Sequence, residues 1–453
     1  MFSECSNLGN LVSLNDDEQV LSLNEEFSDQ ECFLSEVTRP DGNVGQIKFS
    51  EPEKFEDNVA DISEKEFLMA RCGKYYNLEA NFLVKTKIQR KINHWKAQKN
   101  RPISILSLNF DSFPRNYFRR LPQTLRLLTT MGFLDFKGFQ SVAPSSVENF
   151  LGLLTGMETS TVLRKCAPSS PNSTFDACPF VWKYYNENNF VSMFTGDDSP
   201  TFSWNLGEGF RRNPTDYYTY PLFQSRGKFR QENSQSRVSQ LCMGQYHPQK
   251  FIFDYVQRFL TKFEDTPFFS FVWNKVDFHD SDYFGRMDND FALLLQAIGS
   301  LDILERTMII IIGSNWTNYE NTQNVTHGRG FFERPSSALF IRAPQHLFQK
   351  YPHEDMKNSL ELNTKRLVTG YDINHTLKHL LVLNGMNFQE NVTVEATDFS
   401  TFELVSIFNF LPSFRERSSL LVPVNEERTC ADVKIRENNC ACRTNRSVTG
   451  KFY

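Results

Sequence analysis

Short apolar runs of strand length alternate with segments of helical periodicity between residues 103 and 383. The runs are apolar throughout, which is typical of strands buried on both faces of a parallel sheet. Predicted strands are 103–109, 190–195, 268–273, 307–313 and 337–341, and predicted helices are 117–131, 147–154, 181–188, 248–263, 287–304 and 372–383. This alternation predicts an α/β fold in which a mostly parallel central sheet is flanked by helices.

Composition divides the chain into three predicted parts: an acidic N-terminal appendage at 1–70, an α/β domain at 71–423 and a polar, cysteine-rich C-terminal tail at 424–453. Residues 1–70 hold 17 acidic against 4 basic residues, whereas 71–453 hold 37 against 45. The appendage is expected to be either a small β structure or partly disordered. The basic excess is modest and spread out, so nucleic acid is a poor candidate partner. The basic segment 85–101 is better explained as a solvated connector than as a binding patch.

Nine cysteines and six Asn-x-Ser/Thr sequons, at Asn172, Asn315, Asn324, Asn374, Asn391 and Asn445, favour an oxidising secretory compartment with several disulfides. No Cys-x-x-Cys pair occurs, which weakens a zinc-ribbon or thioredoxin interpretation. Cys430, Cys440 and Cys442 are expected to tie the tail to the body. The first twenty residues lack a signal sequence, and no apolar run is long enough to span a membrane. We therefore expect that this start omits a signal-encoding segment; the alternative is a cytosolic protein with idle sequons.

Candidate chemistry gathers where predicted strands end, which is where ligands bind in open α/β sheets. Asp111 ends the first strand and is either a ligand for a metal or hydroxyl group or the cap of the following helix. Ser145 and Ser146 stand at the start of another predicted helix, whose dipole favours a nucleophile that attacks a phosphate or sulfate. The alternative there is an ordinary capping serine.

Two later stretches offer further ligands. His279 and Asp280 lie among three carboxylates and one imidazole after the third strand, the inventory that a divalent cation requires. After the strand at 307–313 come Ser-Asn-Trp-Thr at 314–317 and Thr-His-Gly-Arg at 326–329. In the second of these, His327 is a candidate ligand, and Arg329 together with Arg334 could clamp an anion.

Several motifs in one order then resemble a known family. They are Asp111 followed by Ser-x-x-Arg, Leu-Leu-Thr-Gly at 153–156, Pro-Phe-Val-Trp-Lys at 179–183, Gly-Asp-Asp at 196–198, Pro-Thr-Asp-Tyr-Tyr at 214–218, Gly-Arg at 328–329 with Glu-Arg-Pro at 333–335, and Cys-Ala-Asp at 430–432 with Cys-Ala-Cys at 440–442. Over roughly 60–445 the chain resembles an uncharacterised animal family, a named domain of unknown function, within the alkaline phosphatase and sulfatase superfamily.

The resemblance implies an alkaline phosphatase/sulfatase-like fold, usually secreted or membrane-anchored. Active superfamily members hold one or two divalent metals at strand ends, where a Ser, Thr or formylglycine nucleophile attacks phosphorus or sulfur. By this resemblance Asp111 falls on the first ligand position, Ser146 or Ser145 near the nucleophile, and His279 with Asp280 on the middle His-Asp element. The cofactor implied is one divalent metal, zinc or calcium, and none if the ligands are lost.

The sequence departs from the family pattern after the fourth strand. The family commonly reads Ser-Asp-His-Gly there, whereas this chain has Asn315 and Trp316 in place of the Asp and His ligands. Asn brings an oxygen without charge, and the indole nitrogen of Trp only donates. A glycan on Asn315 would also block the mouth of the site. The formylglycine signature is missing too, since Val142 stands two residues before Pro144 and no Arg follows, so a sulfatase proper is not expected.

These observations favour an extracellular or secretory-pathway member that has a degraded metal site and binds or scaffolds an extracellular partner of unknown identity. The alternative is an active metal-dependent phosphate-ester hydrolase with a serine nucleophile, in which Asp111, His279, Asp280 and His327 surround one metal. A second alternative is a cytosolic α/β protein of unknown role.

Overall fold

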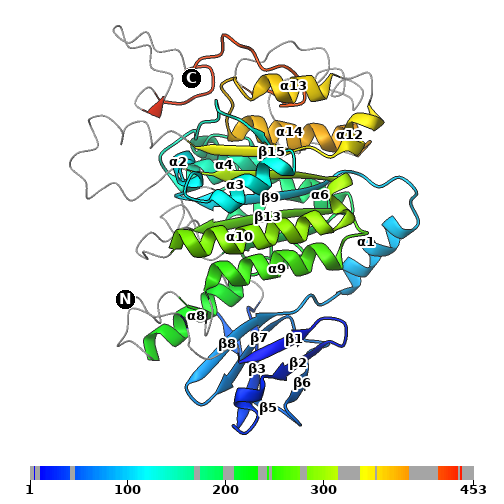
Figure 1. Cartoon of the computed structure of the whole chain (residues 1–453), viewed down its shortest axis with the longest axis vertical. Coiled ribbons are helices and arrows are strands. Elements are labelled where there is room, and N and C mark those ends of the chain that lie inside the picture. Colours follow the sequence, from blue (N-terminus) through cyan, green and yellow to red (C-terminus); the bar gives the residue numbers. More distant parts are fainter. Residues whose placement is uncertain are drawn as a thin grey trace, which may run out of the picture. The chain divides into compact units, whose positions relative to one another are not determined.

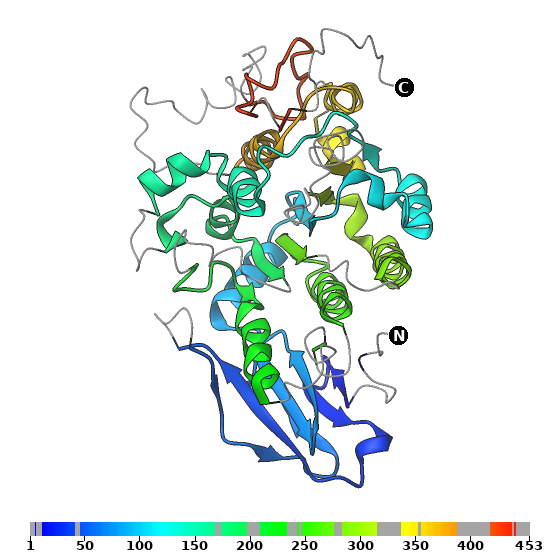
Figure 2. The same cartoon turned by 90° about the vertical axis from the view of Figure 1, so that its left-hand side faces the viewer.

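The computed structural model describes residues 5, 11–40, 46–167, 174–196, 209–232, 242–243, 247–275, 283–314, 337–351, 355–386, 417–436 and 439–440. The chain divides into two compact units. Unit 1 comprises Met1–Arg101, Ser170–Asp176 and Asn189–Ile303, and unit 2 comprises Pro102–Ser169, Ala177–Asn188 and Leu304–Tyr453. Figure 1 and Figure 2 show the elements of both units in two views.

The N-terminal part of unit 1 is β structure, which is the first of the two alternatives expected for the acidic residues. One sheet has the order β1-β2-β6, and the other has the order β4-β3-β7-β8 with β5 added on β3, all pairs being antiparallel. The strands are β1 (Val12–Asn15), β2 (Val20–Leu23), β3 (Cys32–Thr38), β4 (Lys48–Phe49), β5 (Glu53–Lys54), β6 (Val59–Asp61), β7 (Phe67–Cys72) and β8 (Tyr75–Ala80).

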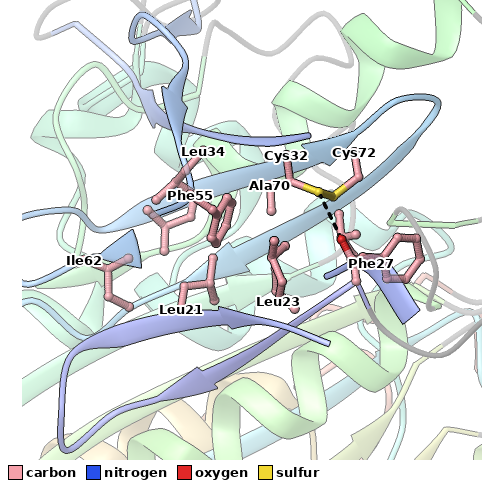
Figure 3. Packing of buried hydrophobic residues seen from close by; sticks show 12 residues of the cluster. Leu21, Leu23, Phe27, Cys32, Leu34, Phe55, Ile62, Ala70 and Cys72 are labelled. Atoms are coloured by element: carbon pink, nitrogen blue, oxygen red, sulfur yellow. Dashed lines mark hydrogen bonds between the residues drawn. A yellow bond between two sulfur atoms is a disulfide. The ribbon is translucent and has the colours of Figure 1, made fainter. Parts of the chain in front are cut away.

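A buried apolar cluster and one disulfide hold these strands together (Figure 3). Leu21 and Leu23 of β2 pack in one cluster with Leu34 of β3. The disulfide joins Cys32 to Cys72, which are opposite one another in the β3–β7 register. The acidic N-terminal region is therefore a folded β structure with its own hydrophobic core.

The remainder of unit 1 is α/β. Its parallel strands have the order β13-β11-β12, and the helices α9 and α10 pack against each other (Figure 1). The strands are β11 (Val191–Gly196), β12 (Tyr217–Tyr218) and β13 (Phe268–Lys275), and the helices are α1 (Thr86–Lys96), α8 (Tyr220–Glu232), α9 (Pro248–Lys262) and α10 (Tyr283–Ser300). Helix α1 is held by the buried ion pair between Lys91 and Asp216. The carboxylate of Asp216 also accepts hydrogen bonds from the backbone N–H and the hydroxyl of Ser192 in β11.

Unit 2 contains the strands β10-β15-β14-β9 in that order. Strands β9 (Ser104–Asp111) and β14 (Thr307–Gly313) are parallel, while β15 (Ala338–Arg342) runs antiparallel to β14 and to β10 (Leu134–Asp135). The helices are α2 (Arg115–Phe118), α3 (Pro122–Thr130), α4 (Ser146–Thr155), α5 (Thr159–Lys165), α6 (Val181–Glu187), α12 (Gln345–Lys350), α13 (Met356–Asn363) and α14 (Gly370–Leu383). Short 3-10 helices at Glu25–Phe27, Phe175–Ala177 and Asp302–Glu305 complete the described elements.

The predicted α/β class with a mostly parallel sheet and flanking helices is confirmed. All five predicted strands exist within a few residues of their predicted bounds. The single helix predicted at 117–131 is wrong, because α2 ends before Leu121 and α3 begins at Pro122. Proline lacks an N–H and its ring is accommodated only at the start of a helix, so it separates the two. The part boundaries at residues 70 and 423 stay predictions.

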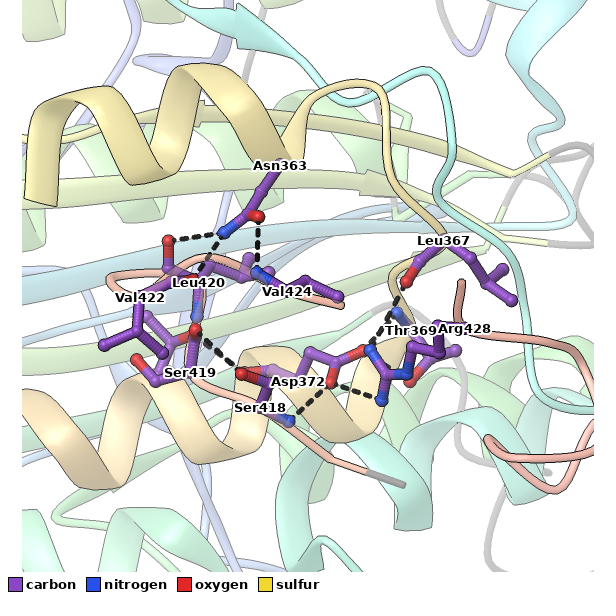
Figure 4. A network of polar contacts seen from close by, with 11 residues as sticks. Asn363, Leu367, Thr369, Asp372, Ser418, Ser419, Leu420, Val422, Val424 and Arg428 are labelled. Atoms are coloured by element: carbon purple, nitrogen blue, oxygen red, sulfur yellow. Dashed lines mark hydrogen bonds and ion pairs between the residues drawn. The ribbon is translucent and has the colours of Figure 1, made fainter. Parts of the chain in front are cut away.

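The described tail is held by buried polar contacts on α13 and α14 (Figure 4). Asn363 accepts the backbone N–H of Val424 at 2.8 Å, and Arg428 forms an ion pair with Asp372. The expectation that the tail cysteines tie it to the body is corrected for Cys430 and Cys440, which bond to each other; Cys442 lies outside the described residues. Among the described helices, none combines the length and the apolar character required to cross a bilayer.

Candidate functional site

Asp111 is the last residue of β9, and its side chain is buried. It does not cap the next helix, because α2 has Pro114 at its N-cap and no side-chain capping bond there. The next residue, Ser112, has a φ of 61°, a left-handed conformation that is uncommon outside glycine and is enriched at functional sites. The strand end therefore turns sharply directly after the carboxylate.

Arg115 of the Ser-x-x-Arg motif fixes this turn. Its Nη1 pairs with Asp135 Oδ1 at 2.5 Å, and its Nη2 donates to the carbonyl of Phe136 at 2.7 Å. Its Nε donates to the carbonyl of Ser337 at 3.3 Å. The motif thus joins the end of β9 to β10 and to the start of β15, which is a positioning role.

Ser146 contacts Asp111 directly. Its hydroxyl lies in the first turn of α4 and donates to Asp111 Oδ1 at 2.7 Å. The interpretation of Ser146 as an ordinary capping serine therefore does not apply. Ser145 stands at the N-cap position of α4 but makes no side-chain capping bond. Of the two serines considered from the sequence, Ser146 is the one placed against the carboxylate.

Ser314 is a third member of the cluster; it begins the 314–317 stretch noted from the sequence, where it was not singled out as a site residue. It follows β14, and its hydroxyl donates to the same oxygen, Asp111 Oδ1, at 2.9 Å. Its backbone N–H donates to the carbonyl of Phe110, continuing the parallel pairing of β14 with β9. The signal that could have found it is register, since it follows the strand that lies next to β9 in parallel.

Asn149 organises the turn in front of Ser146. Its Oδ1 accepts the backbone N–H groups of Val142 and Ala143 at 2.9 and 3.3 Å. Its Nδ2 donates to the carbonyls of Ala143 and Ser145 at 2.8 and 2.9 Å. One amide side chain therefore satisfies four backbone groups and fixes the path of the chain into α4, and hence the position of the Ser146 hydroxyl.

The described residues at this site do not by themselves fit a divalent cation. Asp111, Ser146 and Ser314 are 5%, 2% and 5% exposed, and together they offer one carboxylate and two hydroxyls. Within the described residues Asp111 belongs to no group of three carboxylate, imidazole or thiol ligands. Zinc and calcium both require more ligands and more negative charge than this.

The other predicted site residues have no described position. They are His279, Asp280, Asn315, Trp316, His327, Arg329 and Arg334, all of which lie outside the described residues. The predicted ligand set therefore stays a prediction apart from Asp111. The structure brings together Asp111 and Ser146, and it adds Ser314.

Fold and site together define an α/β protein with a buried carboxylate–hydroxyl cluster at the ends of two parallel strands and the start of one helix. The chain belongs to the family described as "Protein of unknown function (DUF229)", whose profile matches residues 3–452. Comparison with curated protein sequences gives no match.

Solved structures that resemble the chain include "Ps i-CgsB in complex with k-i-k-neocarrahexaose", at 15% identity, with a TM-score of 0.45 and 66% and 75% of the two chains covered. A second is a protein in the alkaline phosphatase superfamily from Vibrio parahaemolyticus, at 12% identity, with a TM-score of 0.40 and coverages of 64% and 73%. A third is the phosphonate monoester hydrolase SpPMH from Silicibacter pomeroyi, at 10% identity, with a TM-score of 0.43 and coverages of 64% and 75%.

Proposed function

We propose that this chain is an alkaline phosphatase/sulfatase-like protein of an oxidising compartment that acts by binding or scaffolding and has little or no hydrolase activity. The observation that carries the proposal is the donor set at Asp111, where the described side chains offer one carboxylate and two hydroxyls, both of which donate to Asp111 Oδ1. In this arrangement the hydroxyl of the candidate nucleophile donates a hydrogen bond to the carboxylate that would otherwise hold a metal. A serine hydroxyl is a weak nucleophile unless a metal or a base lowers its pKa or removes its proton, and one carboxylate with two hydroxyls is a poor donor set for a divalent cation.

Two features of the sequence support the same conclusion. Asn315 and Trp316 stand where the family commonly has an aspartate and a histidine, so a metal would lose one negative charge and one imidazole. Four disulfides among the described residues support an oxidising compartment, since disulfides persist there.

The second candidate function is an active metal-dependent phosphate-ester hydrolase. The specific observation in its favour is the distance of 2.7 Å between Ser146 Oγ and Asp111 Oδ1. Asp111 and Ser146 would then hold one cation together, and that cation would lower the pKa of the Ser146 hydroxyl. The further ligands would come from His279, Asp280 and His327.

Metal content and turnover, measured on the same purified full-length protein, distinguish these functions. After dialysis against zinc, calcium or manganese, bound metal is measured by mass spectrometry, and hydrolysis is measured with an aryl phosphate, a phosphodiester and an aryl sulfate. We expect substoichiometric metal and background turnover, both unchanged in Asp111→Ala and Ser146→Ala. One metal per chain with turnover that both substitutions abolish would establish the hydrolase instead.

Ser107→Ala serves as the matched control. Ser107 is a buried serine of β9, the strand that ends at Asp111, and its hydroxyl contacts Asn109 rather than Asp111. Activity that disappears equally in Ser107→Ala and Ser146→Ala would reflect damage to the strand rather than loss of a nucleophile.

A further inference from the structure

A disulfide and an imidazole form a separate cluster in unit 1. The disulfide joins Cys5 to Cys242, and His247 lies beside it. The two sulfur atoms and a ring nitrogen of His247 all lie within 4.8 Å of one another. Among the described residues this is the only place where three such ligand atoms gather, and it is unrelated to the Asp111 site.

Exposure and charge suit this cluster to metal chemistry after reduction. Cys5 is partly exposed, so a small thiol can reach its sulfur, whereas Cys242 is buried. Burial, together with the positive charge of Arg286, lowers the pKa of His247. The thiolate of a reduced cysteine is the form that binds metals.

The position of His247 fixes the imidazole near the sulfurs. It is the N-cap residue of α9, and Pro248 follows as the first helical residue. Proline locks its own φ and restricts the residue before it to extended conformations, so the backbone that carries the ring has little freedom. A tetrahedral zinc ion with Zn–S bonds of about 2.3 Å and Zn–N bonds of about 2.0 Å requires its ligand atoms to be about 3.5 Å apart. Once the disulfide opens, the two sulfurs therefore need to move apart to about this spacing, whereas the ring nitrogen, which lies within 4.8 Å of both, needs to approach them by no more than about 1.3 Å.

We propose that Cys5, Cys242 and His247 form a reduction-gated site for a zinc-class cation. A small thiol reduces the disulfide, so that two external thiols lose their protons and electrons to the Cys5–Cys242 bond and leave as an external disulfide. The cation then displaces the two cysteine protons and binds two thiolates and the imidazole, with water as the fourth ligand. In the oxidised protein both sulfurs are bonded to each other, and the site does not bind metal.

Cobalt and zinc binding to the full-length protein tests this proposal. With the disulfides reduced, we expect one equivalent of Co²⁺ to give a thiolate-to-cobalt charge-transfer band that one equivalent of Zn²⁺ removes. The oxidised protein should give no band. His247→Ala should weaken zinc binding at least about tenfold. His346→Ala, which changes a histidine of α12 that belongs to no group of three possible ligands among the described residues, should leave binding unchanged. Absence of the band after reduction, or equal affinity in His247→Ala and the parent, would overturn the proposal.

Reduction also opens the other three disulfides and could unfold the chain, so a second variant avoids it. Cys5→His removes the disulfide partner and supplies an imidazole in its place while the remaining disulfides stay oxidised. This variant should bind zinc without reductant, and the double variant Cys5→His/His247→Ala should not. Zinc binding that is absent from Cys5→His would contradict the proposed ligand geometry. Because none of these variants touches Asp111 or Ser146, the result is independent of the proposed function.

Discussion

The buried ion pair between Arg428 and Asp372 gives the sharpest stability prediction. The two side chains are 1% and 0% exposed, and Arg428 Nη2 lies 2.8 Å from Asp372 Oδ1. Asp372 also accepts hydrogen bonds from the backbone N–H of Ser418 at 2.8 Å and from the N–H and hydroxyl of Thr369 at 2.7 and 3.0 Å. Figure 4 shows how this carboxylate joins the start of α14 to the tail.

Removing the cation leaves a buried carboxylate without its partner charge. A loss of this kind costs about 3–5 kcal/mol, whereas an exposed i,i+4 pair is worth about 0.3–0.5 kcal/mol. We therefore expect Arg428→Ala to lower the free energy of opening α14 by about 3–5 kcal/mol. Arg428→Lys should have an intermediate effect, because an ammonium keeps the charge but lacks the fork of donors.

Native-state hydrogen exchange of the α14 amides measures this free energy locally, which suits a chain built from two units. Lys250→Ala is the control, since it removes the half-exposed i,i+4 pair between Lys250 and Asp254. The reasoning is refuted if Arg428→Ala changes the opening free energy of α14 no more than Lys250→Ala does.

Three further predictions concern the same unit. Burial lowers the pKa of His379 to about 4, and burial, with the positive charges of Lys378, Arg417 and Arg428, lowers that of His375 to about 3. The unfolded chain therefore binds more protons than the folded chain below pH 6.5. As the pH falls from 6.5 to 4, the free energy of unfolding should decrease by up to about 1.4 kcal/mol per pH unit for each histidine. Urea unfolding should show that this free energy depends less steeply on pH in His379→Gln than in the parent protein. Asn374 is fully buried and donates to the carbonyl of Leu153, so its sequon should carry no glycan; a glycopeptide containing Asn374 from protein expressed through a secretory pathway would contradict this placement. Gly156 has a φ of 72°, and a Cβ there would lie 2.5 Å from Asn374 Oδ1, whereas Gly132 has a φ of 77° with open space around it. Gly156→Ala should therefore lower the melting temperature more than Gly132→Ala, which incurs only the backbone penalty of about 1 kcal/mol.

The buried parallel strands could be predicted because a short, wholly apolar run bounded by turn residues is compatible with few structures other than a buried strand. The strand at Thr307–Gly313 was predicted with its bounds, and α14 was predicted within two residues of its start. Errors arose where local chemistry competes with periodicity, as at Pro122, which divides a run with helical spacing into two helices. Helix α1 was missed because its basic, polar composition resembles a solvated connector, and only its buried residues Ile88, Lys91 and Trp95 mark it as packed.

The sequence allowed the two site residues that stand at a strand end and at a helix start to be predicted. Asp111 and Ser146 could be proposed separately because each stands at such a point, but their hydrogen bond depends on how α4 meets β9. Ser314 and Asn149 were missed because their roles come from register and from backbone contacts across a turn. Neither kind of contact leaves a pattern in the residues themselves.

The most direct test of the account is anomalous diffraction at the zinc edge from crystals of the oxidised full-length protein soaked with zinc and inorganic phosphate. We expect no metal at Asp111 and continued hydrogen bonding of Ser146 and Ser314 to its Oδ1. An anomalous peak bound by both Asp111 Oδ1 and Ser146 Oγ would contradict it.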